Sequence, residues 1–179
     1  MEDIVQLTVE FVRTNKAWAP LVVGLLAFGE SLAFISLLLP AWGALVAMGA
    51  LIREGALDFV WIWLAASLGA ALGDWLSYWL GLKFEHSIAK MWPLSRHPDL
   101  LPRGHAFVEK YGVYAIFIGR FFGPLRASVP LAAGIFEMEY WHFQIANFAS
   151  AFLWVAVLLL LGDVAWVAFR WIGGFFGWF

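Results

Sequence analysis

The hydrophobic positions of the chain form long tracts rather than the spaced stripe of an amphipathic surface helix. The first tract covers residues 17–52, and its only charged residue is Glu30. A membrane-spanning helix needs about 20 residues, so this tract is too long for one span and too short for two spans with a turn. Pro40 interrupts it and predicts two helical arms, one down to about Leu39 and a shorter one over 41–52.

Two further tracts are each long enough for one full span. They cover residues 59–82 and 140–162, and the second has no charged residue when His142 is neutral. In the first of them small residues recur at every fourth position, which lets another helix approach closely. These residues are Gly69, Gly73, Ser77 and Gly81.

Residues 111–136 repeat the pattern of the first tract. Two apolar arms flank the sequence GPLR, and neither can cross a core of about 30 Å at about 1.5 Å per residue. Pro40 and Gly49 align with Pro124 and Gly134 at an offset of about 85 residues. One full span and a polar connection separate the broken segments, so they should enter the membrane from opposite sides. We therefore predict an all-α polytopic membrane protein, an inverted repeat of two re-entrant, proline-broken helical hairpins, each followed by a transmembrane helix.

Composition supports the membrane assignment. The 179 residues are 63% hydrophobic and 13% charged, whereas soluble domains carry about 25% charged residues. We expect one integral membrane domain over 1–179. The absence of cysteine excludes disulfides and thiolate chemistry, and a net charge of −2 gives no footprint for nucleic acid. The first 16 residues do not resemble a secretory signal peptide, so the first apolar tract is expected to stay in the mature protein.

The basic residues predict the orientation. Five of the eleven Lys and Arg lie in the connection 83–110, whereas the N-terminus has only Arg13 and Lys16. Because cytoplasmic loops are enriched in basic residues, this connection is predicted to be cytoplasmic and the N-terminus extracytoplasmic, in a bacterial-type inner membrane. The aromatic tail 163–179 fits either an interfacial segment or a last marginal crossing.

Four charges fall inside the apolar tracts: Glu30, Asp74, Arg120 and Arg126. A charged side chain at the bilayer centre costs about 2.5–3.5 kcal/mol on insertion scales, so these four should face inward and pair. One interpretation is a structural cluster that holds two hairpins together. The other is a polar site for an anion or a proton path, with Glu30 and Asp74 as proton carriers or counter-charges.

The sequence GRFFGPLR favours the anion site. Arg120 and Arg126 flank Pro124, and a guanidinium group binds phosphate or carboxylate through two parallel hydrogen bonds. A half-helix that begins near residue 125 would add its N-terminal N–H groups. The helix breaks that line this site are expected at Pro40, Pro124 and Pro130. The alternative is that each arginine extends to the membrane interface.

Polar residues on the full spans are candidates for supporting roles. Tyr78 lies on the helix face of Asp74, and Asn147 shares a face of the last span with Gln144, Ser150 and Trp154. Such groups more often join helices than bind substrate. The histidines lack metal-ligand spacing, and no hydrolase or nucleotide motif occurs. We therefore expect no metal, no cofactor and no enzymatic activity.

These motifs resemble one known family. The sequence GRFFGPLRASVPLAAG, preceded by GDWLSYWLG and followed by Asn147-x6-Trp154, resembles the DedA family, which shares its core with the SNARE-associated Golgi (VTT) proteins. The resemblance covers about residues 25–165. It implies a transporter-like fold with two facing re-entrant hairpins. It also implies flipping of polyprenyl-phosphate carriers or phospholipids, which depends on the proton-motive force in several bacterial members. The functional acids and arginines of the family match Glu30, Asp74, Arg120 and Arg126.

Two departures from the family pattern matter. Many members carry an acid just after the first proline, where this chain has Trp42, so proton coupling would rest on Glu30 and Asp74 or be absent. The last helix of the family is expected to be reduced to the aromatic tail.

The expected function is transport of a phosphate-bearing lipid, with membrane lipids and protons as partners. Undecaprenyl phosphate is the favoured substrate and a glycerophospholipid the second. A non-transporting scaffold protein is the rival, since a fold does not fix a function. The identity of the lipid, the direction of transport and the presence of a homo-oligomer stay open.

Overall fold

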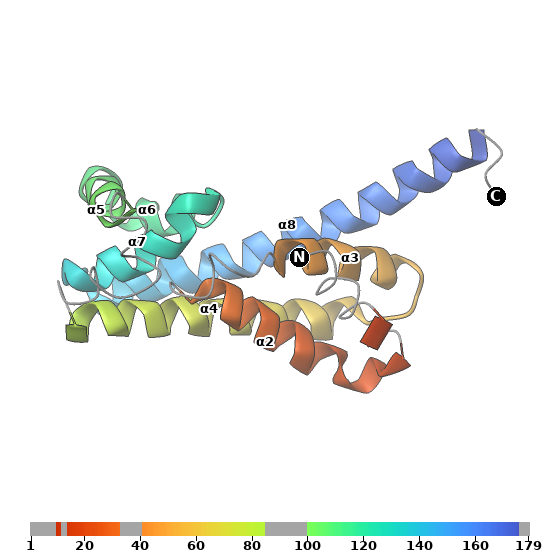
Figure 1. Ribbon diagram of the computed structural model, residues 1–179, viewed down its shortest axis with the longest axis horizontal. Coiled ribbons are helices and arrows are strands. Elements are labelled where there is room, and N and C mark those ends of the chain that lie inside the picture. Colours follow the sequence, from red (N-terminus) through yellow and green to blue (C-terminus); the bar gives the residue numbers. More distant parts are fainter. Residues whose placement is uncertain (1–9, 12–13, 33–40, 85–99, 176–179) are drawn as a thin grey trace.

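The computed structural model describes residues 10–11, 14–32, 41–84 and 100–175, and within these ranges it contains helices and short turns but no strand (Figure 1). Pro40, the predicted break of the first tract, lies outside the described residues. The helices are η1 (Lys16–Trp18), α2 (Ala19–Ser31), α3 (Ala41–Arg53), α4 (Phe59–Phe84), α5 (Leu100–Tyr111), α6 (Val113–Gly119), α7 (Gly123–Ile135) and α8 (Tyr140–Phe175).

Two long apolar helices run side by side and in opposite directions through the molecule (Figure 1). They are α4 and α8, about 39 and 54 Å long at about 1.5 Å per residue. Among the described residues only these two are long and apolar enough to cross a membrane, α8 over Tyr140–Ala168. The predicted spans at 59–82 and 140–162 are confirmed as helices.

The last helix is longer than the sequence predicts. The predicted span ends at residue 162 with a separate tail, but α8 continues without a break to Phe175. Asp163 lies within this helix, and its carboxylate forms an ion pair with Arg53 at the end of α3, with 3.5 Å between Nε and Oδ1. In Figure 1 the C-terminal part of α8 projects away from the other helices.

The shorter helices pack along the two long helices, α4 and α8. α2 and α7 pack along α4, whereas α3 and α6 pack along α8. In Figure 1, α3 leads from the middle of the molecule to one end and α7 leads from the middle to the other. Each of these two helices is followed by a turn and then by a long helix, α4 after α3 and α8 after α7.

Glycine pairs bring two of these helix pairs into backbone contact. Gly49 of α3 faces Gly162 of α8, and Gly134 of α7 faces Gly81 of α4. A Cβ atom built on any of the four would lie 3.0 Å from the Cα atom of its partner and would also overlap a backbone carbonyl of the facing helix. The predicted close approach along the small-residue face of α4 is thus confirmed at Gly81.

The same face of α4 also receives α2. A Cβ atom on Gly69 would overlap the backbone of Gly24, and one on Gly73 would meet the side chain of Ser31 at 2.7 Å. Because these glycines have no side chain, the last turn of α2 lies directly against the middle of α4. This contact positions the polar residues at the end of α2.

The first helix of the tract 17–52 is shorter than predicted. α2 ends at Ser31 rather than near Leu39, and Leu32 has an extended backbone with φ −73° and ψ 127°. A hydropathy pattern does not predict the residues from other helices that interact with the last turn of α2. The Ser31 carbonyl accepts a hydrogen bond from the Ser77 hydroxyl, 3.3 Å away, and a guanidinium group lies beside the last turn, where cations stabilise a helix.

Two further sequence predictions are corrected. Residues 100–110 of the connection 83–110 are not a loop but belong to α5, which packs on α7 and turns into α6 at Gly112. This glycine has φ +54°, a left-handed conformation that glycine adopts without strain. Pro130 does not break a helix, because α7 continues past it to Ile135.

The second break lies just before its proline. The chain leaves helical geometry at residues 120–122, and Phe122 is extended with φ −107° and ψ 106°. Pro124 stands in the first turn of α7, where its missing N–H has no helical partner to lose. The half-helix predicted near residue 125 is therefore confirmed, with its start at Gly123.

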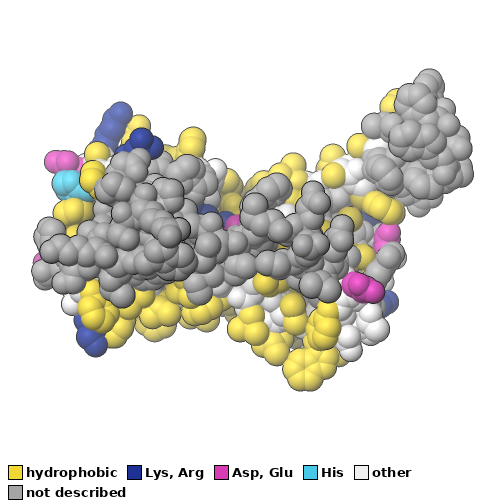
Figure 2. Space-filling view, in the orientation of Figure 1, with side chains coloured by type: hydrophobic (Ala, Val, Ile, Leu, Met, Phe, Trp, Pro, Cys, Tyr) yellow, Lys and Arg dark blue, Asp and Glu magenta, His cyan; other side chains and the backbone are white. Residues whose placement is uncertain are grey.

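Charged side chains on the surface gather at the two ends of the molecule, and the lower side between them in Figure 2 is hydrophobic. Large apolar side chains are exposed along α4 and α8, among them Trp61, Leu68, Ile145 and Leu160. Such a surface is unsuited to water and suits contact with lipid chains.

Candidate functional site

A polar layer divides the interior into two apolar clusters. One cluster joins α2, α3, α4 and α8 and reaches Ala71 and Trp154. The other joins α4 to α8 with α5, α6 and α7, and begins at Tyr78 and Ala146. The side chains between them are buried and polar: Glu30, Ser31, Asp74, Ser77, Arg120, Arg126, Asn147 and Ser150.

Arg120 occupies the centre of the first ion pair. It lies in the turn after α6, is 3% exposed, and pairs through Nη2 with the Asp74 carboxylate of α4. The same nitrogen donates to Oδ1 of Asn147 on α8 at 2.6 Å. Asn147 in turn donates to the Ala71 carbonyl of α4 at 2.9 Å. Thus α4, α8 and the break before α7 meet at one guanidinium group.

Arg126 forms the second ion pair. It lies in the first turn of α7, is 7% exposed, and donates from Nη1 to Oε1 of Glu30 at 2.7 Å. Its Nη2 donates to the Ser31 hydroxyl at 3.2 Å. Its Cζ atom stands 4.0 Å from the ring centroid of Trp154 on α8. The end of α2 is thereby joined to the start of α7.

The two ion pairs belong to one cluster. Arg126 is close enough to act electrostatically on both Arg120 and Asp74. Two guanidinium groups and two carboxylates sum to zero charge when all are ionised. The prediction that the four intramembrane charges face inward and pair is confirmed, and the alternative that the arginines extend to an interface is wrong.

Several buried polar atoms of this cluster have no hydrogen-bond partner among the described residues. They are Nε and Nη1 of Arg120, Nε of Arg126 and Oδ1 of Asp74. Native interiors rarely leave such groups unpaired, so each one calls for a partner. Three of the four are donors on guanidinium groups, which is the chemistry that binds an oxyanion.

Tyr78 and Pro130 are two further predicted site residues in the described part of the chain. Tyr78 donates its hydroxyl to the Met138 carbonyl at 2.6 Å and stacks on Phe143, with 4.2 Å between ring centroids. Pro130 is buried within α7. Trp42 is a helical residue of α3 whose side chain lies outside the described part. Among the described residues no group of three or more metal-ligating side chains forms.

Two arginine partners were not predicted. Ser31 was missed because a serine beside an acid in an apolar tract is unremarkable by itself. The sequence predicts Trp154 as a member of a polar helix face and of the Asn147-x6-Trp154 motif, but not as a partner of an arginine. Seven residues are about two helical turns, so the spacing places Asn147 and Trp154 on one face of α8. From this spacing both residues could have been predicted to lie near the arginines.

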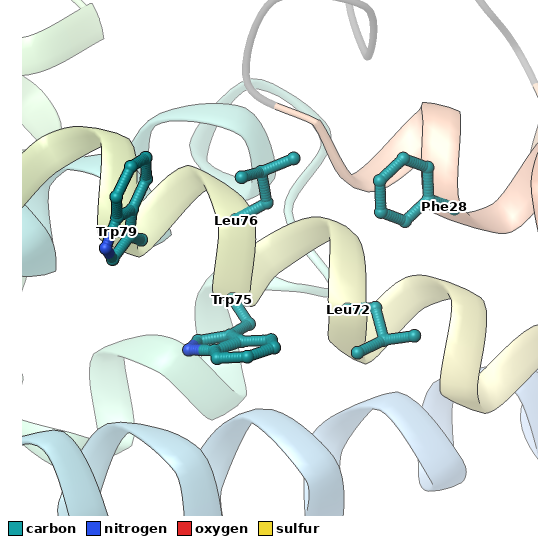
Figure 3. A pocket seen from close by; sticks show the side chains of 5 residues that line it. All are labelled: Phe28, Leu72, Trp75, Leu76 and Trp79. Atoms are coloured by element: carbon teal, nitrogen blue, oxygen red, sulfur yellow. The ribbon is translucent and has the colours of Figure 1, made fainter.

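A groove of about 360 Å³ lies on another face of α4 (Figure 3). Its described lining is apolar and consists of Phe28, Leu72, Trp75, Leu76 and Trp79. At 100° per residue these α4 side chains face away from Asp74. Trp75 and Trp79 are exposed, so the groove opens to the surroundings and is separate from the polar layer.

Comparison with known proteins places the chain in a family. The VTT domain matches residues 39–164, which include α3 through most of α8. The chain is 31% identical to the inner membrane protein YabI of Escherichia coli K12 over 94% of its own length and 74% of that protein. It is 34% identical to the inner membrane protein YqjA of the same strain over 69% of its length and 57% of that protein.

A membrane protein of Buchnera aphidicola subsp. Acyrthosiphon pisum is 32% identical over 89% of the chain. The chain spans 62% of the length of that relative. No solved structure matches. The fold and the charge cluster define an all-helical membrane protein with a buried polar site. The chain belongs to the VTT-domain, or DedA, family of membrane proteins.

The buried and exposed ion pairs should differ sharply in their effect on stability. We expect Asp74→Ala to lower the free energy of unfolding by about 3–5 kcal/mol, because it leaves the Arg120 charge buried without its counter-ion. Asp163→Ala is the matched control, since its partner Arg53 is exposed, and it should cost less than about 1 kcal/mol. Denaturant unfolding in detergent micelles, followed by circular dichroism, measures both. Equal losses would contradict this view of the cluster.

Proposed function

We propose that the protein translocates a phosphate-bearing lipid across the membrane and that Arg120 and Arg126 bind the phosphate. The observation that carries this proposal is a set of three buried guanidinium nitrogens without a hydrogen-bond partner among the described residues, namely Nε and Nη1 of Arg120 and Nε of Arg126. They belong to two arginines in one cluster. A phosphate oxygen accepts several hydrogen bonds, so one phosphate can satisfy donors from both side chains.

The position of the cluster favours an anion as the ligand. The N-terminus of α7 begins three residues before Arg126, and its first N–H groups have no helical partners. Charge-assisted hydrogen bonds are strong in a poorly screened interior. Undecaprenyl phosphate is the substrate we favour, and a glycerophospholipid is the second, since both present a phosphate on an apolar body.

Electroneutrality of the cluster supports coupling to protons. When a phosphate enters a cluster of zero net charge, it leaves one or two uncompensated negative charges in a medium that penalises them. A proton on Glu30 or Asp74 would restore the balance and release a guanidinium donor to the phosphate. We propose that phosphate binding and proton binding favour each other at this site.

We also propose that the fold is an inverted repeat of two re-entrant hairpins. The proposal is supported by the matched glycine contacts: Gly49 meets Gly162 as Gly134 meets Gly81, at sequence offsets of about 85 and 81 residues. It is also supported by the paths of α3 and α7, which lead outward from the middle to opposite ends (Figure 1). In such folds the substrate site lies where the broken helices meet, and the two repeats rock around it.

The location we propose is a bacterial-type inner membrane, because the relatives YabI and YqjA are named as inner membrane proteins. The end of the molecule formed by α4 and α5 carries the exposed basic residues Lys83, Arg103 and Lys110. The positive-inside rule assigns this end to the cytoplasm and the N-terminus to the opposite side.

A scaffold protein in which the charges only lock helices together is the second candidate function. It is favoured by one observation, namely that each arginine already has an acid partner. Because a guanidinium group binds each carboxylate of the cluster, we propose that these acids do not act as catalytic groups of an enzyme. The roles of lipids and protons as partners rest on the transport proposal.

Lysine substitutions separate transport from scaffolding. A lysine keeps the charge and can pair with an acid, but it lacks the planar fork. We expect Arg120→Lys and Arg126→Lys to reduce flipping of undecaprenyl phosphate in liposomes about tenfold or more while the proteins stay folded and monodisperse. The control is Arg53→Lys, which changes an exposed arginine outside the cluster. Parental flipping by both cluster variants would remove the anion site and leave the lock.

Neutral amides test the proposed proton coupling. Protonation of an acid is favoured as pH falls, so lipid-phosphate binding by the parent should strengthen toward acidic pH. Glu30→Gln and Asp74→Asn keep an acceptor atom for the arginine but cannot take up a proton, and we expect each to flatten the pH profile. The measurement is lipid-phosphate affinity against pH in liposomes, with Asp163→Asn as the control. Unchanged profiles in both cluster variants would refute the coupling.

Single cysteines test the orientation, since the chain has none of its own. We expect a cysteine at position 103 to react with a membrane-impermeant maleimide only after the cells are opened. A cysteine at position 54, in the turn between α3 and α4, should react in intact cells. The reverse pattern would invert the proposed topology.

A further inference from the structure

Trp154 contacts the guanidinium group of Arg126 through its aromatic ring, whereas the other contacts of this arginine are hydrogen bonds. Its ring centroid lies 4.0 Å from Cζ of Arg126. Both side chains are buried, at 5% and 7% exposure. A cation over the face of an indole is attracted by the ring quadrupole, and the attraction is strongest where water is excluded.

The contact with the indole leaves the hydrogen-bond donors of Arg126 available. A guanidinium group has five N–H donors in one plane, and the cationic centre of Arg126 lies over the indole ring. Two of the nitrogens donate in plane to Glu30 and Ser31. The Nε donor has no partner among the described residues. Trp154 therefore restrains this cation without occupying a donor.

The other arginine is held in a different way. Asn147 accepts a hydrogen bond from Nη2 of Arg120 and so uses one of its donors. Asn147 and Trp154 are seven residues apart, which places them two turns apart on one buried face of α8. Each arginine is thus held by an acid from one helix and by a second side chain from α8.

We propose that Trp154 is a positioning residue of the phosphate site. The cation–π contact fixes the plane of the Arg126 guanidinium, so that the edge carrying Nε stays directed to the ligand. This inference rests on the proposed phosphate site. It gives the aromatic ring at this position a role, and it distinguishes Trp154 from a residue that merely fills volume in the apolar cluster of α2, α3, α4 and α8.

Fluorinated tryptophans separate these two roles, because each added fluorine weakens the negative face of the ring with little change in shape. Tryptophans with one, two and three ring fluorines are placed at position 154 by nonsense suppression, and affinity for undecaprenyl phosphate is measured in liposomes of neutral lipid. We expect affinity to fall stepwise, about 2- to 30-fold over the series, with little change in melting temperature.

The matched control is the same series at Trp63. This tryptophan also lies between α4 and α8, but its indole N–H donates to the Phe152 carbonyl at 2.9 Å and its ring packs on Phe152. Its affinity series should be flat. A flat series at position 154, or an equal slope at both positions, would overturn the positioning role.

A double-mutant cycle checks the pair without reference to transport. Trp154→Leu and Arg126→Met are combined, and melting temperatures are measured in detergent. We expect the double variant to lose less than the sum of the single losses, whereas additive losses would overturn the contact. Parental protein that fails to bind undecaprenyl phosphate would overturn the proposed function, even where the cycle still shows coupling. Parental binding with a flat fluorine series would overturn this inference alone.

Discussion

A guanidinium group enclosed by apolar helices needs an anion within hydrogen-bond distance, because removing either charge from water costs several kcal/mol. Arg120 and Arg126 meet this requirement with acids that lie far away in the sequence, Asp74 and Glu30. The end of α2, the middle of α4 and the break before α7 therefore converge on one small volume. The helix breaks, the glycine contacts and the polar face of α8 are all arranged around that convergence.

Short side chains complete the cluster only because the helices come unusually close. Ser77 reaches the Ser31 carbonyl across a contact in which Gly73 has no side chain, and Ser31 accepts a hydrogen bond from Arg126. A longer residue at position 73 would hold α2 away from α4 and widen the gap that the Ser77 hydroxyl spans. Close packing of backbones is thus what supplies the charges with polar partners, in addition to the dispersion that it gains.

Hydropathy predicted the two long helices and the inward-facing cluster of four charges, and Pro124 predicted the break before α7. These patterns failed at helix ends and at pairings. The end of α2 at Ser31 depends on Ser77 and Arg126, which are far away in the chain. The assignment of Glu30 to Arg126 rather than to Arg120 depends on how the helices cross, which no local pattern encodes. The pairing of Asp163 with Arg53 of α3 is likewise a contact between residues far apart in the chain.

The glycine pairs between α3 and α8 and between α4 and α7 have a mechanical consequence. Where side chains interdigitate, one helix moves along another only by lifting its ridges out of the grooves of its neighbour. At these crossings smooth backbone faces smooth backbone, and there is no ridge to lift. Sliding by a fraction of a turn at these points then meets little steric resistance. The Asp74–Arg120 ion pair joins α4 to the turn that leads into α7, so a change of charge there acts directly on the freedom of the α4–α7 crossing to move.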